Sequence, residues 1–245
     1  MTSSPKYGRV VVKISGESLS GTGESGFNES AITSVIDELA LAKQSGAEIA
    51  VVVGGGNILR GRDLSDVEAV ARTTADSMGM LATIMNALAL RDCLVGRGLD
   101  ARAMSAINVD DHCEPFVRAR AIKHLKAGRI VILAGGTGKP YFTTDMCAAL
   151  RSCQLDADVM MKATKVDGVF DSDPVKNPSA KKYDSLTYDK VLADRLGVMD
   201  LTAVVMCMEN NLPVMVFALN KQGNLAKAIA GEKVGTLLSA ARDER

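Results

Sequence analysis

The stretch VVVGGGNILRG, Val51 to Gly61, runs from an apolar β-branched segment directly into three consecutive glycines and a single arginine. Three adjacent valines without polar alternation are typical of a strand buried on both faces of a sheet. Glycine permits positive φ angles and lets the main chain approach a ligand without an intervening Cβ. A glycine-rich turn between a strand and a helix also gathers backbone N–H groups into an anion-binding concavity. We therefore predict a phosphate-binding turn here, with plain turn geometry as the alternative.

The composition excludes several classes of function. The 245-residue chain carries 29 basic and 29 acidic residues, so its formal net charge gives no bias toward polyanions. Aromatic residues make up only 4% of the sequence and it has no tryptophan, which leaves few side chains for stacking on bases. Nucleic acid is therefore not an expected partner.

The cysteines and the amino terminus bear on location. The five cysteines are Cys93, Cys113, Cys147, Cys153 and Cys207, and they show neither a C-x-x-C pair nor metal-ligand spacing. Such a set is typical of reduced thiols in the cytosol. The segment MTSSPKYGRVVVK lacks the apolar region of a signal peptide, and no apolar run reaches the length of a membrane span. We expect a cytoplasmic protein without a membrane partner.

Strand-like segments alternate with segments of helical period along the chain. The predicted strands are residues 9–14, 48–53, 101–107, 129–136, 158–163 and 213–218, and the clearest helical spacing covers residues 32–42, 67–95 and 116–125. This alternation predicts βαβ units, and hence an α/β fold: a three-layer αβα sandwich around a mainly parallel sheet.

Two loops rich in glycine, serine, proline, asparagine and aspartate, residues 15–28 and 170–187, interrupt the alternation. Long loops of this kind are usually functional lids or disordered segments. Neither loop has the composition of a linker between domains. We therefore expect residues 1–245 to form one domain with two lobes.

Several chemically active residues follow the predicted strands, where ligands of open α/β sheets bind. Lys13 is a cation inside an apolar strand, which costs desolvation unless an anion pairs with it; a lysine reaching out to solvent is the alternative. A second glycine-rich loop, AGGTGKPYFTTD, leads to Thr144 or Asp145, either of which could cap a helix. Lys162 and Lys165 could neutralise charge in a transition state.

Other conspicuous residues have ordinary interpretations. The two glycine loops match neither the Walker nor the Rossmann phosphate-binding pattern. His112 lies in NVDDHCEP, where consecutive acidic residues favour a helix start, so we expect no metal ligand there. We interpret His124 as a charge at a helix C-terminus and Asp167-Gly168 as a turn.

Seven motifs together resemble the UMP kinase branch of the amino acid kinase family. They are VVKISGE, VVVGGGNILRG, ADSMGMLATIMNALALRD, ARAMSAI, GTGKPYFTTD, DVMMKATKVDGVFDSDP and VMDLTAV, and they cover nearly the whole chain in the family's order. The lysine strand, the glycine loops and the VDG turn are shared by the wider family, whereas DSMGM and PYFTTD indicate the UMP branch. The resemblance implies transfer of the γ-phosphoryl group of ATP to UMP, giving UDP and ADP, in pyrimidine nucleotide biosynthesis.

The resemblance also implies where each substrate binds. ATP would contact Lys13, Ile14, Ser15, Gly16, Gly56 and Arg60, with Thr164, Phe170 and Asp173 around its adenosine. UMP would contact Gly55, Asp76, Thr137, Gly138, Lys139, Pro140, Tyr141, Phe142, Thr143 and Thr144. Asp145 would orient the lysines Lys13 and Lys162, which makes these three the implied catalytic residues. Mg²⁺ is expected with ATP, and the triple glycine would lie between the donor and acceptor phosphates.

Assembly and control are further implications of the resemblance. The resemblance implies a cytoplasmic hexamer that is inhibited by UTP, and members of the family are often activated by GTP. Val95 stands where some GTP-activated relatives carry a histidine, which is a departure from the pattern, although Arg91, Asp92, Arg102 and Arg129 remain.

The expected chemistry needs no general base. A phosphate oxygen of UMP would be the nucleophile, and it is already ionised near neutral pH because the second pKa of a phosphate monoester is about 6. In-line positioning and charge neutralisation by Lys13, Lys162, Mg²⁺ and backbone N–H groups would then suffice. Two alternatives stay open: a kinase for a carboxylate acceptor, which would need cationic groups for a zwitterion, and a non-catalytic nucleotide sensor, against which the retention of Lys13 and Asp145 argues.

Overall fold

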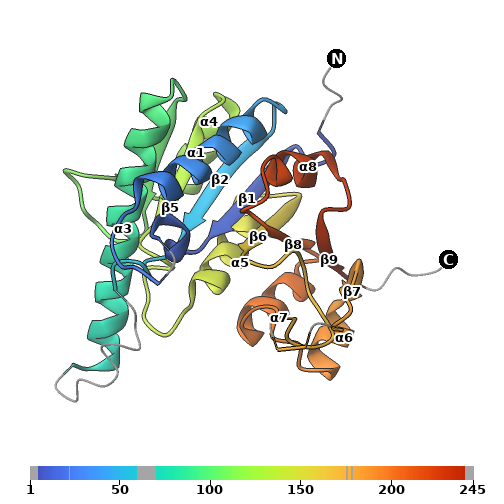
Figure 1. Cartoon of the computed structure of the whole chain (residues 1–245). Coiled ribbons are helices and arrows are strands. Elements are labelled where there is room, and N and C mark those ends of the chain that lie inside the picture. Colours follow the sequence, from blue (N-terminus) through green and yellow to red (C-terminus); the bar gives the residue numbers. More distant parts are fainter. Residues whose placement is uncertain (1–4, 22, 60–69, 175, 178, 241–245) are drawn as a thin grey trace.

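The computed structural model describes residues 5–21, 23–59, 70–174, 176–177 and 179–240, whose strands form one nine-stranded sheet (Figure 1). Its six central strands, in spatial order, are β3 (Ala101–Ser105), β5 (Ile130–Ala134), β2 (Glu48–Val53), β1 (Arg9–Ile14), β6 (Val159–Thr164) and β8 (Val214–Ala218). These neighbours all pair in parallel. The carboxyl ends of the central strands therefore meet at one edge, where the predicted ligand loops begin.

Three short strands complete the sheet and are not predicted from the sequence. They are β4 (Glu114–Pro115) beside β3, then β9 (Gly235–Ser239) beside β8, and β7 (Ser185–Thr187) beside β9. β9 runs antiparallel to β8. Segments of two or three residues, such as β4 and β7, are too short to show a clear apolar pattern, and β9 (GTLLS) begins with glycine, which is depleted in strands.

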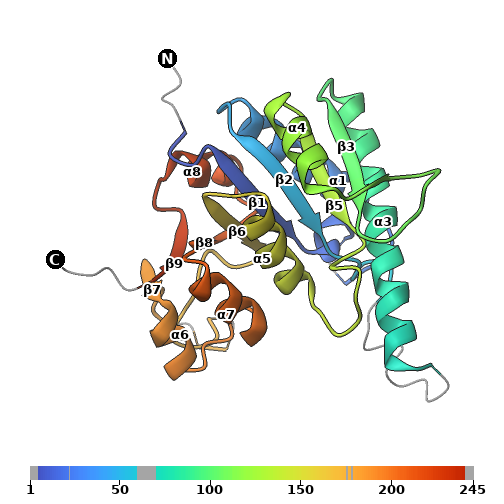
Figure 2. The same ribbon diagram turned by 180° about the vertical axis from the view of Figure 1, so that it is seen from behind.

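Helices cover both faces of the sheet, which confirms the predicted three-layer α/β fold. On one face lie α1 (Glu29–Lys43), α3 (Arg72–Gly96) and α8 (Asn224–Ala230); on the other lie α4 (Arg118–Lys126), α5 (Thr144–Gln154), α6 (Tyr188–Ala193) and α7 (Leu201–Glu209). Figure 1 looks onto α1 and α8, and Figure 2, from behind, onto α4 and α5. Helices α6, α7 and α8 are not predicted from the sequence, and α6 and α8, with six and seven residues, have too few turns to establish a helical period.

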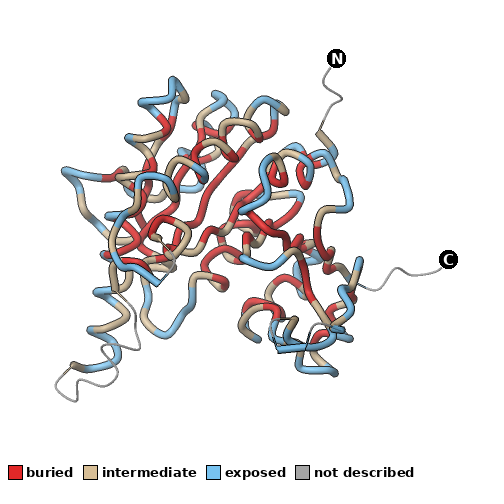
Figure 3. Tube along the Cα trace, in the orientation of Figure 1, coloured by how far each residue is buried: buried red, intermediate tan, exposed pale blue. Residues whose placement is uncertain are grey.

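The core explains why β1 places its lysine as it does. Val10, Val12 and Ile14 pack into the apolar cluster under α1, α3 and α8, whereas Val11 packs into the cluster under α4 to α7. Because side chains alternate along a strand, Lys13 points to the same side as Val11, toward α5. Burial is concentrated along these central strands (Figure 3).

Helix α3 differs from its prediction in where it begins and in the length of its apolar run. It begins at Arg72, whereas residues 67–69 of the predicted helix lie outside the described residues. By length and composition alone α3 could cross a membrane, contrary to the expectation that no apolar run is that long. However, Ile84, Ala87, Leu90 and Leu94 pack into the protein core, while the first turns project from the body of the molecule (Figure 1). We therefore interpret α3 as a core helix.

Candidate active site

A carboxylate between two lysines lies at the carboxyl edge of the sheet. Lys13 and Lys162 are register partners on the adjacent strands β1 and β6. Asp145, in the first turn of α5, places Oδ1 3.1 Å from Lys13 Nζ and Oδ2 2.5 Å from Lys162 Nζ. Lys13 therefore pairs with an anion, and its side chain is only 14% exposed, so the alternative of a lysine reaching into solvent does not hold.

The start of α5 also corrects one prediction. Thr143, and neither Thr144 nor Asp145, is the N-cap: its Oγ1 accepts a hydrogen bond from Met146 N at 3.1 Å. Asp145 is thus free of capping and can turn its carboxylate toward the lysines. Its position in the first turn of the helix also suits a negative charge.

Two cations sharing Asp145 favour the binding of a further anion. Burial lowers the pKa of Lys162, and the attraction of Asp145 opposes that shift. Lys162 Nζ also donates a hydrogen bond to the carbonyl of Val198 at 2.7 Å. Because burying an ammonium group is costly, a phosphate oxygen arriving between the two lysines would stabilise both charges.

The triple glycine is required for close packing rather than for unusual backbone angles. Of the described glycines Gly54, Gly55 and Gly56, none has a positive φ, so that part of the sequence argument is wrong. A Cβ on Gly16, after β1, would lie 2.7 Å from Gly56 N, and a Cβ on Gly55 would lie 2.8 Å from Ala82 Cβ of α3. Only glycine lets the turns after β1 and β2 approach each other and α3 this closely.

The second glycine-rich loop, after β5, does use positive φ angles. Gly135, Gly136 and Gly138 have φ values of 73°, 56° and 78°. Two side chains from different helices hold this loop. Thr83 Oγ1 of α3 accepts a hydrogen bond from Gly135 N at 2.8 Å, and Arg151 Nη2 of α5 donates to the carbonyl of Gly136 at 3.2 Å.

A cavity of about 390 Å³ lies between the two glycine loops, α3 and α5. Seven of the residues predicted for UMP line it: Gly55, Asp76, Thr137, Lys139, Phe142, Thr143 and Thr144. Gly56, predicted for ATP, lines it as well. The other three residues predicted for UMP, Gly138, Pro140 and Tyr141, belong to the second glycine-rich loop but are not among the described residues that line the cavity. The cavity is of a size that holds a small ligand.

Asp76 connects α3 to the second loop. Its carboxylate accepts hydrogen bonds from Arg72 Nε at 3.0 and 3.1 Å and from the backbone N–H of Tyr141 at 2.8 Å. Tyr141 has a φ of 72°, and the guanidinium of Arg72 lies 5.6 Å from the centre of its ring. The carboxylate therefore neither caps α3 nor points only into solvent.

The residues predicted for ATP are spread over a wider area. Thr164 Oγ1, at the end of β6, lies within hydrogen-bond distance of two carbonyl oxygens, those of Val166 and, at 3.1 Å, Phe217. Phe170 lines a second cavity, of about 290 Å³, together with Lys165 and Pro174. Asp173 lies 3.9 Å from Lys176 and is not among the described residues that line this cavity. Arg60 lies outside the described residues.

Asp167, interpreted as part of a turn, is also an ion-pair partner. Its Oδ2 lies 2.8 Å from Lys221 Nζ and 3.9 Å from Lys182 Nζ. The hydrogen bond from Lys221 lowers the pKa of Asp167, and the charge of Lys182 acts in the same direction. Asp167 therefore joins loop segments around the second cavity, in addition to its place beside Gly168.

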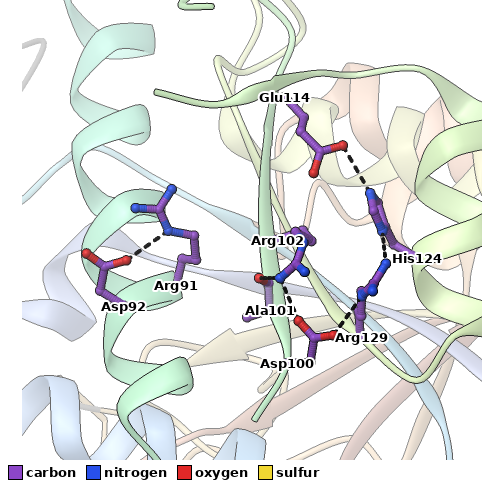
Figure 4. Close-up of polar contacts among 8 residues, drawn as sticks. All are labelled: Arg91, Asp92, Asp100, Ala101, Arg102, Glu114, His124 and Arg129. Atoms are coloured by element: carbon purple, nitrogen blue, oxygen red, sulfur yellow. Dashed lines mark hydrogen bonds and ion pairs between the residues drawn. The ribbon is translucent and has the colours of Figure 1, made fainter. Parts of the chain in front are cut away.

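A chain of charged side chains connects β3, β4 and α4 (Figure 4). Asp100 pairs with Arg102 at 2.5 Å and with Arg129 at 2.7 Å. Arg129 Nη1 donates to His124 Nδ1 at 2.9 Å, and His124 Nε2 lies 3.0 Å from Glu114 Oε2. A guanidinium only donates, so Nδ1 accepts and Nε2 carries the proton. His124 is thus a buried bridge in the last turn of α4, rather than simply a charge at its end.

Several supporting residues are missed by sequence reasoning. They are Arg72, Thr83, Asn86, Arg151 and Asp200. Asp200 caps α7 and accepts a hydrogen bond from Thr143 Oγ1; burial would raise its pKa, but hydrogen bonds from Thr143, Thr202 and Ala203 N lower it overall. A usable signal exists for two of the five. Thr83 and Asn86 are polar residues three positions apart in the apolar segment MLATIMNALAL, and that spacing places them on one helix face.

The sheet is mainly parallel, and at its carboxyl edge two closely packed glycine turns lie beside two lysines that share one carboxylate. These features are typical of an α/β protein that binds phosphate groups. More specifically, the chain matches the amino acid kinase family over residues 8–218 and belongs to it.

Individual relatives show which branch of the family the chain is similar to. The chain is 48% identical over 239 residues to a chloroplast uridylate kinase of Arabidopsis thaliana, covering 97% of this chain and 70% of the relative. It is 46% identical over 236 residues to the uridylate kinase of Dichelobacter nodosus, covering 96% and 98%. The crystal structure of UMP kinase from Bacillus anthracis matches with a TM-score of 0.93 and 37% identity, covering 96% of this chain and 97% of the other. The resemblance seen in the motifs is therefore confirmed.

Proposed function

We propose that this chain transfers the γ-phosphoryl group of ATP to UMP, giving UDP and ADP, in pyrimidine nucleotide biosynthesis. The observation that carries the proposal is Asp145 bridging Lys13 and Lys162 beside the two glycine turns, because this group would neutralise a phosphoryl group in transfer. The similarity to proteins named uridylate kinase and UMP kinase supports UMP as the acceptor.

The mechanism is one of positioning and charge neutralisation. A phosphate oxygen of UMP attacks the γ-phosphorus of ATP, and the bond to the leaving ADP oxygen breaks in line with it. Lys13 and Lys162 neutralise the oxygens of the transferring group, while Asp145 fixes both ammonium groups in place. Because the attacking oxygen is ionised above a pH of about 6, no side chain has to remove a proton.

The substrates occupy different lobes in this proposal. UMP takes the cavity of about 390 Å³ and contacts Gly55, Asp76 and residues 137–144. ATP lies along Lys13 to Gly16, Gly56 and Arg60, with its adenosine near Thr164, Phe170 and Asp173. The two neighbouring glycines Gly55 and Gly56 then face the acceptor and the donor respectively, which would explain the triple glycine.

Mg²⁺ fits this site as a companion of ATP. Asp145 Oδ1 is buried and accepts no hydrogen bond from the described residues, although Lys13 Nζ is 3.1 Å away. That oxygen is available to a water molecule of the ion's hydration shell, since Mg²⁺ usually keeps several waters. When bound, the ion would neutralise the β- and γ-phosphate oxygens of ATP.

The assembly, the regulators and the location are part of the same proposal. A homohexamer is supported by exposed apolar side chains along α3, namely Met78, Leu81, Met85 and Val95. UTP is the expected inhibitor, and GTP is a possible activator that would approach Arg91, Asp92, Arg102 and Arg129 (Figure 4). A cytoplasmic location rests on the sequence alone.

A coupled assay of ADP release tests the activity. The purified chain with ATP and Mg²⁺ is offered UMP, CMP, dUMP, aspartate or glutamate in separate reactions. ADP release with UMP well above the other acceptors is the expected result. Preference for an amino acid would indicate a carboxylate kinase of the same fold. Tight UMP binding with no turnover would instead indicate a nucleotide sensor.

A further inference from the structure

Two buried asparagines hold the triple-glycine turn. Asn57 directly follows the turn and Asn86 lies on α3, and their side chains are 1% and 0% exposed. Their amides form a reciprocal pair: Asn57 Nδ2 donates to Asn86 Oδ1 at 3.1 Å, and Asn86 Nδ2 donates to Asn57 Oδ1 at 2.7 Å. The second hydrogen of each amide goes to a backbone carbonyl, so both donor groups are fully used.

The carbonyl partners connect three parts of the chain. Asn86 Nδ2 donates to Gly54 O at 2.6 Å, which fixes the start of the triple-glycine turn on α3. Asn57 Nδ2 donates to Gly26 O at 2.9 Å, and Gly26 N donates back to Asn57 O at 2.7 Å. The pair therefore ties the turn to α3 and to the loop that follows β1. Because each carbonyl needs a donor, these contacts also fix the orientation of both amides.

The same pair determines how closely the two phosphate-facing turns approach. Asn57 Oδ1 would lie 2.5 Å from a Cβ on Gly16, so the asparagine is packed directly against the turn after β1. Gly54 N also donates to Ile14 O at 2.9 Å, which joins the ends of β1 and β2. Neither asparagine is among the described residues that line the 390 Å³ cavity, so both act through the glycines rather than on a ligand.

We propose that Asn57 and Asn86 are positioning residues that set the distance between the donor and acceptor phosphates. The inference rests on the proposed function, in which Gly16 and Gly56 face ATP and Gly55 faces UMP. Each substrate has most of its contacts elsewhere, so loss of the amide pair would leave separate binding nearly unchanged. Phosphoryl transfer would slow, because a small misplacement of two reacting groups lowers the rate steeply.

Two variants and a control test this assignment. Asn86→Leu keeps the branching of the side chain but removes the donors to Gly54 O and Asn57. The double variant Asn57→Leu/Asn86→Leu removes both amides, so neither amide is left buried without its partner. Gly54 O and Gly26 O lose their donors, which is why Tm is measured alongside activity. Tyr188→Phe is the matched control. It removes another buried hydrogen bond, from Tyr188 Oη to Leu212 O, in the cluster on the opposite face of the sheet.

The measurements separate positioning from stability. For each variant we would determine kcat at saturating ATP and UMP, the Kd of UMP alone and of a non-hydrolysable ATP analogue alone by calorimetry, and Tm. We expect the double variant to bind both ligands as the parent does and to lose about 10- to 100-fold in kcat. Tyr188→Phe should keep its kcat whatever its Tm.

Three results would overturn the inference. One is a folded double variant with the parent kcat. Another is a loss of kcat in Tyr188→Phe as large as that in the asparagine variants at equal Tm, since destabilisation would then explain both. The third is a parent chain that does not phosphorylate UMP, which would remove the proposed function as well. The first two leave the proposed function standing, so the two failures can be distinguished.

Discussion

At the scale of single residues, Lys13 is a largely buried cation whose position the proposed phosphoryl transfer would explain. Its side chain follows three valines in β1, and its ammonium group pairs with Asp145 at 3.1 Å. We predict that Lys13→Met lowers kcat for UMP by about 10²- to 10³-fold, because the charge counts most while a phosphoryl group is in transfer. Steady-state kinetics with circular dichroism as the folding check would measure this.

The matched control is Lys190→Met, which removes an exposed lysine paired with Asp194 on α6. That variant should retain the parent kcat. Comparable UMP turnover in a folded Lys13→Met protein would remove Lys13 from the mechanism.

Asp76 supports a second prediction at the same scale. An ionised carboxylate only accepts hydrogen bonds, so it suits a sugar hydroxyl and would repel a phosphate. A hydrogen bond to a charged group contributes about 1.5–3 kcal/mol, which corresponds to roughly 10- to 150-fold. We predict that Asp76→Ala lowers kcat/KM for UMP by about that factor and reduces the preference for UMP over dUMP.

Kinetics with both acceptors would decide the role of Asp76. Asp37→Ala, which breaks an exposed pair with Arg97, is a suitable control because Asp37 is not among the described residues that line the cavity. If Asp76 only holds Tyr141 N and Arg72, its loss would change turnover of UMP and dUMP equally, and the ratio would stay at the parent value.

At the scale of helices and strands, α3 anchors both glycine loops. Asn86 binds Gly54 O, and Thr83, one turn earlier, binds Gly135 N. We predict that Thr83→Val raises the KM for UMP, since a buried N–H left without its acceptor costs about 1–3 kcal/mol. The increase would reach at most roughly 150-fold, with little change in the KM for ATP.

Thr83→Ser is the control for that substitution, because it keeps the hydroxyl and removes only a methyl group. It should restore a KM for UMP close to the parent value. Equal KM values in Thr83→Val and the parent would mean that Gly135 keeps its position without the hydroxyl.

These helices and strands also show which parts of the fold can be predicted from the sequence. The six central strands are predictable because parallel strands buried on both faces are continuous apolar runs. The lysine on β1 and the glycines after β2 also stand out from their surroundings. By contrast, β4 and β7 are edge strands of only two and three residues, and the partners of Thr83 and Asn86 are backbone atoms distant in sequence. No local pattern encodes such contacts, since the fold alone brings them together.

At the scale of the whole molecule, the exposed apolar face of α3 supports the proposal of a hexamer. Met78, Leu81 and Met85 lie at a spacing of three and four residues, which places them on one side of the helix, and they are 38%, 49% and 51% exposed. An apolar stripe of this kind is typical of a surface that another subunit covers. Light scattering at micromolar concentration should therefore give the mass of six chains of 25.8 kDa.

A substitution in the middle of that stripe tests which surface is responsible. We predict that Leu81→Glu reduces the measured mass to that of a smaller assembly, because a charge buried in an apolar contact without a partner is strongly unfavourable. Val205→Glu is the matched control, since Val205 is a comparably exposed apolar residue, at 39%, on α7. A monomer mass for the parent would reject the hexamer. An unchanged mass in Leu81→Glu would place the subunit contact on a surface other than this face of α3.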